Sequence, residues 1–303
     1  MRRLPPTALP LRAALLAIAL LGAVLALTAG PAHAKPLRNG VIAYAVQRCY
    51  DPNQSFDCST RVRTVGPRGR SHRRLPCSEP LVRRCADRYP RFSPNGRRLA
   101  TVQSEDFADS YLAIRTLRGR VLNRRLVREG VADLAWGPLG RSFAVNDFER
   151  IQFLDRSTGR LRLYRKTGGA DVAWSRQGRL AWSNSPAGTL VVTDRRKRNI
   201  RRYRVRGGAS IPRWSPSGER LAYFSVLGSG VYAINADGTG RRLLSRRCGG
   251  TVEDSLAWSP DGRRIACTTD LGDLVTIDVR TRRSRLLVSN IYPLDIDWQA
   301  RTR

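Results

Sequence analysis

The chain has 303 residues, of which 41% are hydrophobic and 26% are charged, and this balance excludes a disordered chain. Lys and Arg number 55 against 24 Asp and Glu, so the formal net charge of +31 favours contact with acidic partners without naming one. The only histidines are His33 and His72, which argues against Ser-His-Asp hydrolysis and against metal sites built from several histidines.

Residues 1–34 have the pattern of a signal peptide. Basic residues precede the apolar run 13–29, and Ala-His-Ala at residues 32–34 offers small side chains for cleavage after Ala34. The run is short for a transmembrane helix, so we expect an exported mature chain, residues 35–303, with no membrane-spanning segment. Its expected location is extracellular, periplasmic or cell-wall associated. The alternative is an uncleaved anchor, which would make the chain a sensor ectodomain.

All six cysteines follow residue 34, and an even number in an exported chain favours disulfides over metal ligation. No CxxC motif is present to lower a thiol pKa, so redox catalysis is not expected. Proximity along the chain favours the pairs Cys49–Cys58, Cys77–Cys85 and Cys248–Cys267, although spacing alone leaves other pairings open.

One sequence unit recurs along the rest of the chain. It reads PRFSPNGRRLATV from Pro90 and LAWSPDGRRIACT from Leu256, with further copies from Leu134, Val172 and Pro212. The aromatic residues of these copies, with one more near the C-terminus, are Phe92, Trp136, Trp174, Trp214, Trp258 and Trp298. A spacing of about 40 residues is typical of a four-stranded propeller blade.

A second pattern follows each copy, in which two alternating apolar runs flank a polar turn, as in residues 231–244. Alternation with period two predicts strand hairpins with one buried face. The sequence therefore predicts a single all-β domain over residues 35–303, a six-bladed β-propeller of four-stranded antiparallel blades. Residues 39–44 match the second half of the unit and residues 295–298 the first half, so we expect the N- and C-terminal strands to pair and close the ring.

The Trp-Ser-Pro-x-Gly-x-x-Leu/Ile-Ala core and the following Asn-Ala-Asp-Gly-Thr-Gly turn resemble the TolB-type, WD40-like propeller repeat, over residues 39–303. This resemblance implies an exported propeller that binds other proteins. The same repeat occurs in propellers that cap prolyl-oligopeptidase-like peptidases. The pattern lacks the α/β domain that precedes the propeller of TolB, which puts a Tol–Pal role in doubt. It also lacks the hydrolase domain of the peptidases, so peptidase activity is not expected.

Antiparallel strands place the first and third turns of every blade on one face of the disc, and basic residues concentrate in these turns. We call it the basic face. The candidate rim for an anionic partner is Arg195, Arg196, Lys197, Arg198, Arg201, Arg202, Arg241, Arg242, Arg282 and Arg283. Guanidinium groups pair bidentately with phosphate or carboxylate, which favours an anionic partner. Alternatively, these side chains are a solvated surface that guards strand edges, or they reflect a coding bias.

The second candidate site is the mouth of the central channel, where the innermost strands begin. Its candidate residues are Asp133, Asp171, Asp254, Asp295, Asp297, Arg91 and Arg213. Such a ring could hold a cation or a peptide terminus. The alternative is that the aspartates accept backbone N–H bonds in the tight loops between blades.

The sequence favours a monomeric, non-catalytic scaffold without a cofactor or metal, which binds an envelope protein or an anionic envelope polymer. Nucleic acid is not expected as a partner, because the tryptophans belong to the repeat core rather than to a stacking surface. The alternative function is a propeller enzyme of polysaccharide lyase or glycosidase type with paired carboxylates at the channel mouth. No GxSxG, HExxH or phosphate-binding glycine motif supports an enzyme.

Overall fold

The computed structural model describes residues 37–49, 58–78, 85–104, 110–127, 130–169, 171–184, 188–227, 230–249 and 255–301. These residues form strands β1 to β24. Within the described ranges there is no helix that could cross a membrane. The predicted signal peptide and its cleavage site lie outside the described residues.

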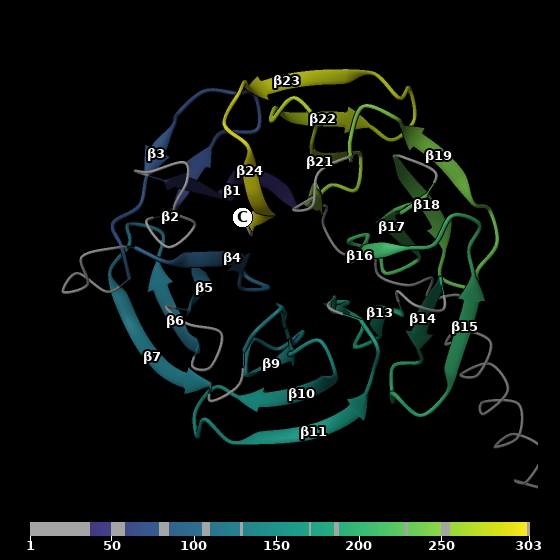
Figure 1. Ribbon diagram of the computed structural model, residues 1–303, viewed down its shortest axis with the longest axis horizontal. Helices are drawn as coiled ribbons and strands as arrows, with labels where there is room; N and C mark the ends of the chain where they lie inside the picture. Colours follow the sequence, from purple (N-terminus) through teal and green to yellow (C-terminus); the bar gives the residue numbers. More distant parts are fainter. Residues whose placement is uncertain are drawn as a thin grey trace, which may run out of the picture. The chain divides into compact units, whose positions relative to one another are not determined.

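The strands form six four-stranded sheets of antiparallel strands, arranged as the blades of a propeller (Figure 1). The first blade consists of β24 (Pro293–Arg301), β1 (Arg38–Cys49), β2 (Cys58–Val65) and β3 (Arg73–Arg74). The second blade consists of β4 (Asp87–Phe92), β5 (Arg98–Ser104), β6 (Ser110–Thr116) and β7 (Val121–Val127). The third blade consists of β8 (Asp133–Trp136), β9 (Ser142–Asn146), β10 (Arg150–Asp155) and β11 (Leu161–Lys166).

The other three blades repeat this order from the innermost strand outward. The fourth blade consists of β12 (Ala173–Trp174), β13 (Leu180–Asn184), β14 (Thr189–Thr193) and β15 (Ile200–Arg204). The fifth blade consists of β16 (Ser210–Trp214), β17 (Arg220–Phe224), β18 (Val231–Asn235) and β19 (Arg242–Ser245). The sixth blade consists of β20 (Leu256–Trp258), β21 (Arg264–Thr268), β22 (Leu274–Asp278) and β23 (Ser284–Val288). The predicted six-bladed, all-β fold is confirmed.

The first blade joins the two ends of the chain. The C-terminal strand β24 is its innermost strand and pairs antiparallel with β1, so that Ile42 faces Trp298. The indole Nε1 of Trp298 also donates to the carbonyl oxygen of Gly40 at 3.1 Å. The predicted closure of the ring is therefore confirmed, and the pairing covers edges that an open array of blades would expose.

The Ser-Pro-x-Gly sequences form the turns that follow the innermost strands. In the second blade the N–H of Ser93 donates to the carbonyl of Arg98 at 2.9 Å, and Gly96 has a φ of 67°. Only glycine adopts this conformation without strain, and a Cβ at residue 96 would also collide with the carbonyl oxygen of Ala300. The turn thus fits closely against the neighbouring blade.

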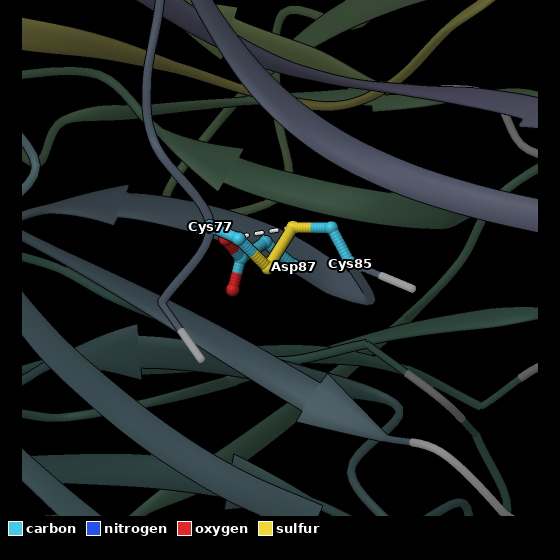
Figure 2. Close-up of side chains that lie close together, drawn as sticks. All are labelled: Cys77, Cys85 and Asp87. Atoms are coloured by element: carbon cyan, nitrogen blue, oxygen red, sulfur yellow. Dashed lines mark hydrogen bonds between the residues drawn. A yellow bond between two sulfur atoms is a disulfide. The ribbon is translucent and has the colours of Figure 1, made fainter. Parts of the chain in front are cut away.

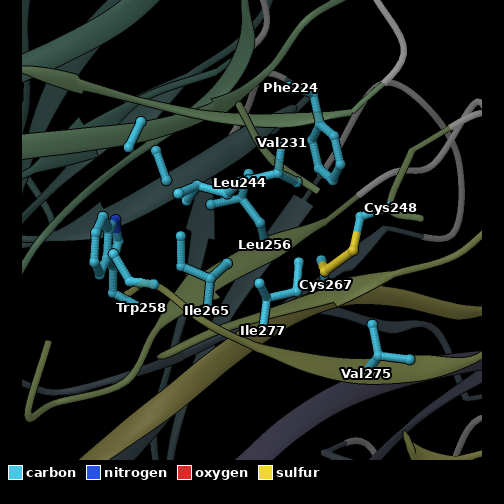
Figure 3. Close-up of a cluster of buried hydrophobic side chains, with 13 residues drawn as sticks. Phe224, Val231, Leu244, Cys248, Leu256, Trp258, Ile265, Cys267, Val275 and Ile277 are labelled. Atoms are coloured by element: carbon cyan, nitrogen blue, oxygen red, sulfur yellow. A yellow bond between two sulfur atoms is a disulfide. The ribbon is translucent and has the colours of Figure 1, made fainter. Parts of the chain in front are cut away.

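The core lies between the blades. Among the described residues, six clusters of buried apolar side chains each join two neighbouring blades. Figure 3 shows the cluster between the fifth and sixth blades, where Phe224 and Val231 pack with Leu256, Ile265 and Ile277. This distribution follows from the alternating strands, because every blade has two faces to bury and a neighbour on each side.

Two of the predicted disulfides are confirmed. Cys248 bonds to Cys267 beside the core shown in Figure 3. Cys77 bonds to Cys85. The backbone register pairs Cys49 with Cys58, but their side chains lie outside the described part, so this pair stays a prediction.

The Cys77–Cys85 bridge lies beside a buried ion pair. Figure 2 shows Asp87 next to the bridge, and its Oδ2 accepts the N–H of Ser78 at 3.0 Å. The same oxygen lies 3.2 Å from Nη1 of Arg115, whose side chain is fully buried and also donates to the carbonyl of Pro76 at 2.9 Å. These bonds anchor the disulfide-bonded loop to the second blade.

Candidate functional site

The aspartates of the innermost strands connect neighbouring blades. Asp133 accepts the N–H of Val172 at 3.2 Å, and Asp171 accepts the N–H of Ile211 at 2.9 Å. Asp297 on β24 accepts the N–H of Phe92 at 2.6 Å. In the same way, Asp295 accepts the N–H of Tyr89 at 3.3 Å. The aspartates accept backbone N–H bonds, as one sequence-based alternative expects, and each has a donor in the next blade. Asp133 also accepts the N–H of Leu134 in its own strand at 2.8 Å. Asp254 lies outside the described residues.

Arg91 and Arg213 converge on Asp133 inside the channel. Nη2 of Arg91 lies 2.6 Å from Oδ1 of Asp133, and Nη1 of Arg213 lies 3.0 Å from its Oδ2. Burial alone would raise the pKa of the Asp133 carboxyl, but the two guanidinium groups outweigh burial and hold this pKa below its ordinary value. The three side chains form a charge cluster in which two arginines share one carboxylate, with a formal charge of +1.

The other channel aspartates have the opposite shift. Burial raises the pKa of Asp171, and the negative charge of Asp133 adds to this effect. Burial also raises the pKa values of Asp295 and Asp297, although nearby arginines oppose it. Within the described residues, these carboxylates belong to no group of three or more metal-ligating side chains that lie close together. Their observed role is to accept hydrogen bonds that join blades.

A cavity of about 190 Å³ opens where the innermost strands reach the basic face. We call it the mouth cavity. It lies where the innermost strands end, whereas the predicted channel mouth lies where they begin, and of the predicted mouth residues it includes Arg91, Arg213 and Asp297. Its wall contains the six aromatic residues of the repeat, Phe92, Trp136, Trp174, Trp214, Trp258 and Trp298. Nε1 of Trp136 donates to the carbonyl of Arg91 at 2.9 Å, and Nε1 of Trp258 donates to that of Arg213 at 3.0 Å. The aromatic ring is therefore part of the scaffold as well as the wall of the cavity.

Arg176 also lines the mouth cavity, although it is not among the predicted residues of either candidate site. Its Nη2 donates to the carbonyl oxygen of Pro94 at 2.7 Å, which links the fourth blade to the second. The signal was present in the sequence, because the repeat has Arg176 where the second, third, fifth and sixth blades have proline.

A larger groove, of about 1010 Å³, lies between the fourth and fifth blades on the basic face. We call it the basic groove and define it by its arginines, which are Arg179, Arg195, Arg196, Arg198 and Arg201. Its wall also contains the carboxylates of Asp194, Glu219 and Asp237. Four residues of the predicted rim thus face one concave surface.

Two of the groove's carboxylates are bound within their own turns. Asp194 accepts the N–H of Arg198 at 2.9 Å and the side-chain amide of Asn199 at 2.8 Å. Asp237 accepts both the hydroxyl and the N–H of Thr239, and these bonds lower the pKa of its carboxyl. These bonds hold two of the three carboxylates of the groove within their own turns, and Nη1 of Arg179 donates to the carbonyl of Gly218 at 3.3 Å.

The remaining rim residues do not form one surface with the groove. The ammonium of Lys197 lies 5.1 Å from the ring centre of Trp174, and Arg241 stacks over Tyr232 and donates to the hydroxyl of Tyr223 at 2.8 Å. Both side chains are held by aromatic groups. The other rim residues are exposed on outer strands or in the turn of the sixth blade, and they are Arg202, Arg242, Arg282 and Arg283.

No protein-family model matches the sequence, and no curated protein matches it. Solved structures do match the fold. TolB from Acinetobacter baumannii is 17% identical, with a TM-score of 0.69, and the match covers 91% of this chain and 70% of that one. A chain of the nidogen/laminin complex is 11% identical, with a TM-score of 0.66, over 86% of this chain and 98% of that one.

A third match is a protein assigned as TolB from Agrobacterium tumefaciens. It is 15% identical, with a TM-score of 0.61, and covers 88% of this chain and 98% of that one. At these identities the likeness concerns the fold, which agrees with the repeat found in the sequence. The chain is therefore, in fold, a six-bladed β-propeller of the TolB type.

Proposed function

We propose that the chain is an exported, non-catalytic scaffold that binds an anionic partner of the cell envelope through the basic groove. The observation that carries the proposal is the groove itself, in which five arginines from one blade line a concavity of about 1010 Å³. Arginine forms paired hydrogen bonds with carboxylate and phosphate groups, and a concave arrangement lets several of them contact one polymer chain or one acidic protein surface.

A binding role agrees with the comparisons. One matched chain was solved within the nidogen/laminin complex, so a propeller of this shape takes part in a complex between proteins. The disulfides Cys77–Cys85 and Cys248–Cys267 support an oxidising compartment, and residues 1–34 have the pattern of a signal peptide. Export remains part of the proposal.

The channel supports a scaffold over the alternative of a propeller enzyme. A glycosidase needs two carboxyl groups free to act on substrate. Here Asp133 is held by two arginines, while Asp171, Asp295 and Asp297 accept N–H bonds that connect blades. These bonds give the four carboxylates a structural role, which favours the scaffold.

A variant series separates groove binding from a general effect of charge. The groove variant changes Arg195, Arg196, Arg198 and Arg201 to Gln, and the matched control changes Arg280, Arg282, Arg283 and Arg285 to Gln on the same face. Affinity of residues 35–303 is measured for immobilised polyphosphate and for poly-L-glutamate at one salt concentration.

The two variants lose the same formal charge, so only the location of the loss differs between them. We expect the groove variant to bind at least one of the probes roughly tenfold more weakly than the control does. Equal affinities for both variants would show that the arginines act as a solvated surface, which is the alternative interpretation.

A further inference from the structure

One position in the wall of the mouth cavity is proline in four of the six blades. Two residues after each aromatic residue of the repeat, the six blades place Ala300, Pro94, Pro138, Arg176, Pro216 and Pro260, and all six line the cavity. Proline has no backbone N–H, so these turns offer few donors to an anion. Arg176 is the charged member of this ring, and it brings a guanidinium to an otherwise apolar rim.

Arg176 differs in its partners from the other two arginines of the cavity wall. Arg91 and Arg213 also line the cavity, but both pair with Asp133. Within the described residues Arg176 forms no salt bridge, and its hydrogen bond goes to the neutral carbonyl of Pro94. Burial lowers the pKa of Arg176, while Asp297 in the wall opposes this shift. A guanidinium in such surroundings binds an anion more strongly than it binds a carbonyl.

The size of the cavity limits its occupant. A volume of about 190 Å³ lies below the range of roughly 300–1,000 Å³ that pockets for drug-sized ligands occupy. It suits one side chain or one chain end rather than a polymer. The wall combines the aromatic residues and prolines of the repeat with the polar side chains of Ser93, Ser175, Ser215 and Asp297. The aromatic and proline surfaces favour an apolar stem, and Arg176 favours a carboxylate at its end.

We propose that the mouth cavity binds a single carboxylate-bearing group of a partner protein, either an acidic side chain or a carboxyl terminus, with Arg176 exchanging the Pro94 carbonyl for the carboxylate. The inference rests on the proposed binding role but uses a site separate from the basic groove. It identifies the partner at this site as a protein that inserts one acidic group into the channel.

Three peptides test the proposal. The first is a glycine hexapeptide that ends in leucine with a free carboxylate, the second is the same peptide as a C-terminal amide, and the third is the amide with one internal glutamate. Tryptophan fluorescence of residues 35–303 reports on binding, because five tryptophans line the cavity, and calorimetry confirms the affinity.

The variants are Arg176→Pro, which introduces the residue that four of the other five blades have, and Arg176→Lys, which keeps the charge. The control is Arg97→Gln, an exposed arginine in the corresponding turn of the second blade, outside the cavity wall. Urea unfolding of each variant establishes that it is folded.

We expect saturable binding of at least one carboxylate peptide and none of the amide. Binding to the free terminus alone identifies a chain end, and binding to the internal glutamate alone identifies a side chain. Arg176→Pro should weaken binding at least tenfold, Arg176→Lys less, and Arg97→Gln not at all. Equal binding of the amide, native affinity in Arg176→Pro, or no saturable binding would overturn the proposal.

The result is distinguishable from a failure of the proposed function. Arg176→Pro should keep the affinity of the native chain for polyphosphate and poly-L-glutamate, and the groove variant should keep its affinity for the carboxylate peptide. Parallel loss of both activities in both variants would contradict the assignment of two separate sites.

Discussion

Arg91 and Asp133 form a buried ion pair across the boundary between the second and third blades, with 2.6 Å between Nη2 and Oδ1. Arg213 reaches the same carboxylate from the fifth blade at 3.0 Å. The innermost strands converge on the channel, so charges from three blades meet at one carboxylate. This cluster links the second, third and fifth blades of the ring.

Replacing Asp133 with alanine should destabilise the propeller strongly. The substitution would remove the salt-bridge partner of both guanidinium groups, and breaking a buried pair in this way costs about 3–5 kcal/mol. The free energy of unfolding in urea measures the effect. The exposed Glu149→Ala should change it by less than about 0.5 kcal/mol. A loss in Asp133→Ala as small as that of Glu149→Ala would contradict the structural role of the cluster.

Asp171 should make stability depend on pH. The pKa of its carboxyl is raised above 3.8 in the folded chain, so the folded state binds this proton more tightly than the unfolded state does. Ionised Asp171 therefore lowers the free energy of unfolding. This loss of stability is absent below pH 3.8, grows as pH rises through the pKa of the folded chain, and is complete above that pKa.

Asp171→Asn removes this titration and keeps a side-chain oxygen that can accept the N–H of Ile211. The free energy of unfolding of the variant minus that of the native chain should therefore be larger at about pH 7 than at about pH 4. Urea unfolding of both proteins at both pH values measures this difference. The same stability difference at the two pH values would show that Asp171 does not titrate differently on folding.

The closure of the ring should depend on Trp298. Its side chain is 4% exposed and packs between the sixth and first blades. Trp298→Ala should cost about 3–5 kcal/mol in the free energy of unfolding. Trp298→Phe keeps a ring but loses the hydrogen bond to Gly40, and should cost less, about 1–3 kcal/mol. If the alanine variant had the same urea midpoint of unfolding as the native chain, Trp298 would not stabilise the closure of the ring.

The Cys248–Cys267 bridge should also stabilise the chain. It links two residues separated by 19 positions, and a loop of about this length contributes about 3 kcal/mol by restricting the unfolded chain. The double variant Cys248→Ala and Cys267→Ala should lower the free energy of unfolding by that amount under oxidising conditions. A reducing agent should make the difference in the free energy of unfolding between the two proteins smaller, because it opens the bridge of the native chain. Equal stability of the double variant and the native chain under oxidising conditions would contradict the expectation.

The fold was predictable because each blade carries its own signature. The aromatic residue and the Ser-Pro-x-Gly turn recur once per blade, and the two half-units at residues 39–44 and 295–298 predict the pairing of β1 with β24. Two cysteine pairs were predictable for a similar reason, because their partners are near in sequence and lie in the same blade or in the loop that leads into it.

The candidate sites were less predictable, because they depend on contacts between blades. Arg91 and Arg213 are far from Asp133 in sequence, and only the curvature of the ring brings them together. The predicted rim treats Arg195 and Arg241 alike, yet Arg195 lines the basic groove while Arg241 bonds Tyr223. Arg176 departs visibly from the repeat, but its position opposite Pro94 requires the closed ring.

The salt dependence of binding tests the central claim, that the basic groove is a docking surface. Affinity for polyphosphate is measured over a salt series for the native chain, the groove variant and the control variant in the sixth blade. Each cationic side chain in contact with the polymer adds about 0.7–0.9 to the magnitude of the slope of log K against log salt. The groove variant loses four such side chains, so the magnitude of its slope should be smaller by about 3. The control variant should keep the native slope. Identical slopes for the groove variant and the native chain would contradict the account.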